Sequence, residues 1–98
     1  MTKLETYLGF AIKSGKVIFG SDKLFDCKKK PQVVLICSSQ NEKVTLKVFK
    51  FCENNNIECI KLKDFVLSEL VKRENCKVIG IIDESLAKAI RLELKMDN

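Results

Sequence analysis

Two short apolar runs constrain this chain more than any other feature of its sequence. Residues 33–37 read VVLIC and residues 78–82 read VIGII, and polar residues bound each run. A strand covered by helices on both faces has this pattern, whereas a strand exposed on one face alternates apolar and polar residues. The two runs therefore predict central strands of a sheet that is buried on both sides.

The remaining segments predict helices that could supply this cover. Apolar residues recur at intervals of three and four in most of them, which is the spacing of one helix face. Strands that alternate with helices indicate an α/β/α sandwich. The helices are expected over residues 3–14, 21–29, 41–54 and 64–71 and from Asp83 or Ser85 onward, and the outer strands over residues 16–19 and 57–62.

The length of 98 residues predicts one domain over residues 1–98. No apolar run approaches the roughly 20 residues of a membrane span, and the N-terminus lacks the long apolar region of a secretory signal. We therefore expect a cytoplasmic protein without membrane contact.

The five cysteines form no CxxC pair, and the chain has no histidine. Cys37, Cys52 and Cys59 fall at core-like positions, so free thiols that pack as small apolar groups are predicted. A catalytic thiol is not expected, because histidine, its commonest base partner, is absent. The sequence thus indicates neither an enzyme nor a metal or cofactor site.

A glycine-led helix start is the clearest candidate for binding. Gly20 permits a tight turn and a close approach to the backbone, and Ser21 is expected to cap the helix that follows. The N–H groups at a helix start suit a phosphate, and Lys16 and Lys23 flank this point. The net charge of +5 also favours a polyanionic partner. The simpler interpretation is an ordinary helix cap.

Other basic and aromatic residues could bind a partner or belong to the ordinary surface and core. Lys13 and Lys16 flank Gly15 near the glycine-led turn and are assigned to the binding surface. Lysines 43, 47 and 50 predict a solvated helix face, because charge on a surface helix is ordinary. Phe10, Phe19 and Phe25 could stack on bases or pack in the core.

Five segments follow one another in a characteristic order. They are YLGFAIKSGKVIFGSDKL at residues 7–24, QVVLICSS at 32–39, a basic helix, IECIKL at 57–62 and KVIGIIDESLAKAI at 77–90. In this order they resemble the small ribosomal proteins of the L-seven-Ae/L-thirty-e family, specifically its short bacterial members, which are similar to kink-turn RNA binders. The resemblance implies a three-layer α/β/α sandwich with a four-stranded mixed sheet. It also implies ribosomal or other structured RNA as the partner.

The resemblance places the RNA site on two segments, residues 20–23 and the loop of residues 71–76. After the glycine, family members carry Thr-Asn-Glu with a lysine three positions after the Glu, whereas this chain has Ser21, Asp22, Lys23 and Asp26. This difference favours, as the alternative, a protein-interaction module of the same fold that lacks kink-turn specificity. The candidate RNA-binding residues are Lys13, Lys16, Gly20, Ser21, Asp22, Lys23, Lys72, Arg73 and Asn75.

Overall fold

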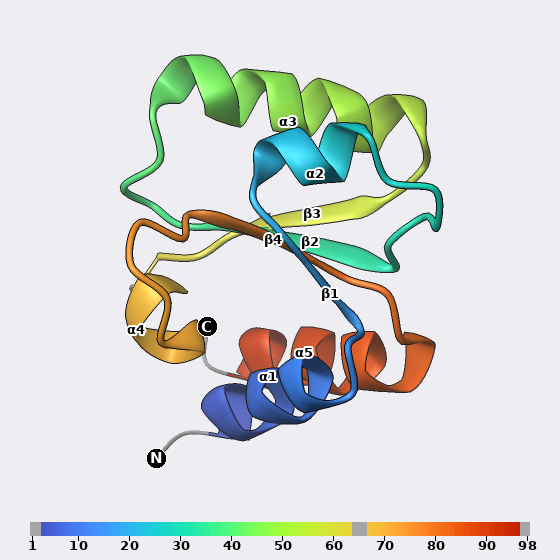
Figure 1. Cartoon of the computed structure of the whole chain (residues 1–98), viewed down its shortest axis with the longest axis vertical. Coiled ribbons are helices and arrows are strands. Elements are labelled where there is room, and N and C mark those ends of the chain that lie inside the picture. The colour runs from blue at the N-terminus through green and yellow to red at the C-terminus, as the bar shows by residue number, and fades with distance from the viewer. Residues whose placement is uncertain (1–2, 64–66, 97–98) are drawn as a thin grey trace.

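The computed structural model describes residues 3–63 and 67–96. Within them the chain alternates helices with strands in the order expected from the sequence (Figure 1). The predicted helix over 64–71 is described from Leu67 onward, because residues 64–66 lie outside the described residues. The elements are α1 (Lys3–Lys13), β1 (Val17–Phe19), α2 (Ser21–Phe25), β2 (Val33–Ile36), α3 (Glu42–Asn54), β3 (Glu58–Lys61), α4 (Leu67–Val71), β4 (Val78–Ile81) and α5 (Glu84–Met96).

The strands form one mixed sheet in the order β1-β4-β2-β3. Strand β4 runs antiparallel to both of its neighbours, while β2 and β3 are parallel. The two apolar runs therefore occupy the centre of the sheet, as predicted, and every residue of β2 and β4 is buried. The shorter strands β1 and β3 form its edges.

Helices cover both faces of the sheet (Figure 1). Val33 and Leu35 of β2 pack with residues of α1, α4 and α5 in one apolar cluster. Val34 and Ile36, which point the opposite way because side chains alternate along a strand, pack with residues of α2 and α3 in a second cluster. This arrangement confirms the three-layer α/β/α sandwich.

Helix α2 is shorter than the sequence predicted. It ends at Phe25 and not near residue 29, so the lysines at residues 28–30 lie outside it. After α2 the chain packs against the sheet at Pro31, which is buried beside Gly80 of β4. A Cβ atom on Gly80 would lie 3.2 Å from the Cβ atom of Pro31. Pro31 therefore occupies the space above this glycine, and residues 26–30 between α2 and Pro31 are not helical.

Three of the described helices are followed by a left-handed residue. In each case the N–H group of the next residue donates to the carbonyl five residues earlier, as in a Schellman motif. These bonds are Lys16 to Ala11 (2.9 Å), Ile57 to Cys52 (2.8 Å) and Arg73 to Ser68 (3.0 Å). At α1 the left-handed residue is Gly15 (φ 70°) and at α3 it is Asn56 (φ 55°), two residue types that adopt this conformation readily. At α4 it is Lys72 (φ 57°), which has no such preference.

Side chains cap the starts of α3 and α5. Asn41 caps α3, where its Oδ1 atom accepts bonds from the N–H groups of Lys43 (2.7 Å) and Val44 (3.3 Å). The Oδ2 atom of Asp83 accepts a bond from the N–H of Leu86 (2.8 Å) at the start of α5. The predicted cap at Ser21 is wrong, because the capping position of α2 is Gly20. Ser21 is already the first helical residue.

No helix in residues 3–63 or 67–96 combines the length and the apolar character needed to cross a membrane.

Candidate nucleic-acid interface

A hollow of about 350 Å³ lies at the end of the sheet where β1 and β2 finish and β4 begins. Three chain segments that are far apart in the sequence form its walls. We call it the sheet-end hollow. Its lining residues are Phe19, Gly20, Ser21, Asp22, Lys23, Gln40, Asn75, Cys76, Lys77 and Val78.

Gly20 shapes one wall of the sheet-end hollow. Its backbone angles are φ 87° and ψ 154°, a region that only glycine adopts without strain. The N–H of Gly20 donates to the carbonyl of Val78 (2.8 Å), and its own carbonyl accepts from the N–H of Leu24 (3.1 Å). A Cβ atom placed on Gly20 would meet nothing within 4 Å. The turn thus exposes bare backbone where α2 begins.

The loop of residues 72–77 forms the opposite wall. It contains two left-handed residues, Lys72 (φ 57°) and Asn75 (φ 59°). The N–H of Arg73 donates to the carbonyl of Ser68 (3.0 Å), and its guanidinium carbon lies 3.9 Å from the centre of the Phe19 ring. This cation–π contact joins the loop to the end of β1.

Lys77 adds a further positive charge to the sheet-end hollow. Its ammonium group lies 3.5 Å from the carbonyl oxygen of Ser39, a residue of the loop after β2. The hollow therefore combines the cations Lys23 and Lys77 with the carboxylate of Asp22 and the amides of Gln40 and Asn75. These side chains can bind an anion and can also form directional hydrogen bonds with neutral polar groups of a ligand.

The thiols belong mainly to the core. Cys37 and Cys52 are buried as predicted, whereas Cys59 is only partly buried.

Burial raises the pKa of the Cys76 thiol above its ordinary value, although the Val78 backbone and the Arg73 charge oppose the shift. Cys76 is therefore a neutral group in the hollow at neutral pH. Burial also opposes ionisation of Cys37, yet hydrogen bonds from Ser39 and the Leu67 backbone and the charge of Lys77 lower its pKa overall.

The structure brings most of the predicted residues to one region, but not all to one hollow. Residues 20–23 and Asn75 line the sheet-end hollow, and Arg73 joins it through Phe19. Lys13 and Lys72 instead line a second hollow between α1 and α4. Lys16 lies at the far end of β1, where its carbonyl accepts a bond from the N–H of Ile82 (2.9 Å). It is therefore not near Gly20.

Sequence reasoning missed several residues of the sheet-end hollow. Gln40 and Lys77 were not singled out, although each stands beside a central apolar strand at the end where the hollow lies. Their places next to β2 and β4 were the available signal.

The lysines at 43, 47 and 50 are exposed on α3, in agreement with a solvated face. In the described part of the chain, no group of three or more Cys, Asp or Glu side chains is placed to hold a metal ion.

The sequence matches no family model and no curated protein, but the fold matches solved structures. A protein of unknown function from Bacillus halodurans is similar with a TM-score of 0.87 and 15% identity, over 97% of this chain and 99% of that one. The 15.5kD RNA-binding protein of Giardia lamblia is similar with a TM-score of 0.72 and 11% identity, over 98% of this chain and 88% of that one. At such identities the likeness establishes a shared fold.

Proposed function

We propose that this protein binds structured RNA through the sheet-end hollow and that it is a member of the L-seven-Ae/L-thirty-e family. The observation that carries the proposal is the convergence of two segments, residues 20–23 and residues 75–78, on one hollow. The resemblance in sequence implied residues 20–23 and residues 71–76, and Asn75 and Cys76 of the second range line the hollow. A solved protein of the same fold is an RNA-binding protein, and the net charge of +5 suits a polyanion.

The chemistry of the hollow divides the binding between two kinds of contact. The first N–H groups of α2 have no partner within the helix, and together with Lys23 and Lys77 they suit phosphate oxygens. Asp22 is exposed at the rim and accepts hydrogen bonds, so it suits the amino groups on base edges. Phosphate contacts position an RNA, whereas base contacts distinguish one RNA from another.

The two separate walls of the sheet-end hollow favour a bent RNA over a straight duplex. The hollow lies between the start of α2 and the loop of residues 72–77, so a bent strand can contact both segments at once. A kink-turn is the bent element that we propose, and ribosomal RNA is one source of it. A straight A-form duplex offers mainly its sugar and phosphate groups. It would supply a phosphate for Lys23 but no base edge for Asp22.

The test is a salt titration of binding to a kink-turn RNA and to a straight duplex of equal length. Lys23→Ala is expected to weaken both RNAs equally and to lower the salt slope by about one. Asp22→Asn is expected to change the preference between the two RNAs. Lys47→Ala, on the exposed face of α3, is the matched control and should change neither result.

A different outcome would favour the protein-interaction alternative. If Lys23→Ala and Gly20→Val both bind the two RNAs as the parent does at every salt concentration, the sheet-end hollow is not the RNA surface. The departure of Asp22 and Lys23 from the family's Asn-Glu pair would then reflect a loss of RNA recognition within a retained fold.

A further inference from the structure

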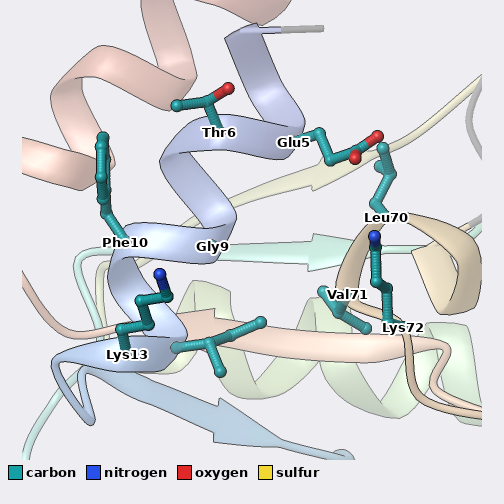
Figure 2. Close-up of a pocket in the computed structure, with 9 residues that line it drawn as sticks. Glu5, Thr6, Gly9, Phe10, Lys13, Leu70, Val71 and Lys72 are labelled. Carbon is teal, nitrogen blue, oxygen red and sulfur yellow. The ribbon is translucent and has the colours of Figure 1, made fainter. Parts of the chain in front are cut away.

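A second hollow of about 420 Å³ lies between α1 and the end of α4. We call it the α1–α4 groove. Its volume falls within the range of about 300–1,000 Å³ that is typical of small-molecule sites. Figure 2 shows Gly9, Phe10 and Lys13 on the α1 wall, and Val71 and Lys72 on the wall formed by α4. The sheet-end hollow shares none of these residues.

Gly9 leaves part of the groove bare without a structural need for glycine. It lies inside α1, where glycine lowers helix stability relative to alanine. A Cβ atom on Gly9 would meet nothing within 4 Å, so packing does not require its absence. Its φ is not among the positive values of the chain. The missing side chain leaves partly exposed helix backbone on the wall of the groove.

The groove also offers an aromatic face and two cations. Phe10 is 56% exposed although it is a large apolar side chain. Lys13 follows it by three residues and is therefore its neighbour on the helix surface. Lys72 faces the groove from the opposite wall (Figure 2). Glu5 of α1 also lines the groove, and Figure 2 shows its carboxylate on the side where Leu70 and Lys72 lie.

The groove is continuous with the proposed RNA surface through a single loop. Lys72 lines the groove, Arg73 contacts Phe19, and Asn75 lines the sheet-end hollow. Lys72 is held in the left-handed conformation at the end of α4 (φ 57°), which is unfavourable for a lysine. A strand of RNA that leaves the sheet-end hollow over this loop arrives at the groove.

We propose that the α1–α4 groove binds one unpaired nucleotide that flanks the structured part of the RNA, an inference that rests on the function proposed above. The base lies on the backbone of Gly9 beside the ring of Phe10, and Lys13 and Lys72 bind the phosphates on either side of it. Unpaired bases commonly stack on aromatic side chains, and basic residues commonly follow the backbone. This chemistry matches the aromatic face, the partly exposed backbone and the paired cations of the groove.

Backbone amide shifts of the labelled protein report on the two hollows separately. The Gly9 and Lys72 amides report on the groove, and the Gly20 and Asn75 amides report on the sheet-end hollow. The probe for the groove is single-stranded tetrauridylate, and inorganic triphosphate tests whether phosphate alone is sufficient. A kink-turn RNA without single-stranded ends is the probe for the sheet-end hollow.

Tetrauridylate is expected to shift the groove amides to saturation, and triphosphate is expected to shift them far less. Phe10→Ala should weaken tetrauridylate binding by about fivefold or more, the lower limit for loss of one stacked base. Leu46→Ala is the matched control, because Leu46 is 58% exposed on α3. Gly9→Leu should fill the groove and abolish the shifts, whereas Gly9→Ala should leave most of the binding intact.

Each contrary result identifies which proposal fails. If tetrauridylate leaves the Gly9 amide unmoved, or if Gly9→Leu binds it as the parent does, the groove is not a nucleotide site. Equal shifts with triphosphate would also overturn the proposal, because the groove would then bind an anion only. If the kink-turn RNA does not move the Gly20 and Asn75 amides while tetrauridylate moves Gly9, the groove proposal stands and the proposed function of the sheet-end hollow fails.

Discussion

Each of the two hollows exposes one glycine, and the two glycines are there for different physical reasons. A Cβ atom on either Gly9 or Gly20 would meet nothing within 4 Å, so neither position is restricted by packing. At Gly20 the backbone itself requires glycine, because φ is 87° and ψ is 154°. At Gly9 the backbone is an ordinary helix, which any residue except proline would tolerate better than glycine.

This difference separates what the fold needs from what a ligand would need. The turn at Gly20 exposes backbone as a consequence of its shape, so its openness is no evidence for binding by itself. Gly9 lacks a role in the turn geometry and in packing, and it weakens its own helix. A bound ligand would account for it, and the four predictions that follow test this contrast.

The largest effect is expected for Gly20→Val. A β-branched side chain at a conformation available only to glycine should lower the free energy of unfolding by about 1–3 kcal/mol. Urea denaturation measures this change. The matched control is Gly9→Val, which should change stability far less, because valine is slightly better than glycine inside a helix. Equal losses at the two positions would show that Gly9 has a structural role as well.

A second effect is expected at Lys72. Replacement by glycine should raise the free energy of unfolding by about 1 kcal/mol, because it removes the strain of a left-handed residue that has a Cβ atom. Asn56→Gly, at the equivalent end of α3, should gain less, since asparagine tolerates this conformation. The same Lys72→Gly variant should bind tetrauridylate more weakly. A variant that is no more stable than the parent would show that the loop does not strain Lys72.

Much of the fold could be predicted because local signals and long-range packing agree. The runs at residues 33–37 and 78–82 are apolar on both faces because helices cover both faces of the sheet. The first helix was expected over residues 3–14 and ends at Lys13, where Gly15 adopts the left-handed conformation that glycine favours. The predicted end of α2 near residue 29 was wrong, since the helix ends at Phe25. The packing of Pro31 against Gly80 is a long-range contact that no local pattern encodes.

The candidate site was less accessible to sequence reasoning, because it is assembled from distant segments. The resemblance identified both walls of the sheet-end hollow, but the contact between Arg73 and Phe19 joins residues whose pairing no spacing reveals. The α1–α4 groove exists only once α4 packs beside α1. In the sequence this groove corresponds to a single glycine, Gly9, next to Phe10. These residues indicate a groove only when α4 is known to pack beside α1.

A smaller effect is expected for Gly9→Ala, which should raise the free energy of unfolding by about 0.5–1 kcal/mol. The gain follows from the lower flexibility of alanine in the unfolded chain. Thermal or urea unfolding measures it, and nucleotide binding should persist because a methyl group fills little of the groove. A loss of stability instead would mean that the added Cβ atom does meet a neighbour and that packing selects the glycine.

The smallest change in stability is expected for Ser21→Ala, within about 0.5 kcal/mol of the parent. The capping position of α2 is Gly20, so the Ser21 hydroxyl is not needed to start the helix and remains available in the sheet-end hollow. Binding of the kink-turn RNA should weaken by about 0.5–1.5 kcal/mol, the net value of one hydrogen bond. Asn41→Ala provides the opposite case, because the Asn41 side chain caps α3 by accepting bonds from two backbone N–H groups. It should lower stability by about 1 kcal/mol and leave RNA binding unchanged. If Ser21→Ala destabilises the protein as much as Asn41→Ala does, Ser21 acts as a cap and the hollow loses that contact to RNA.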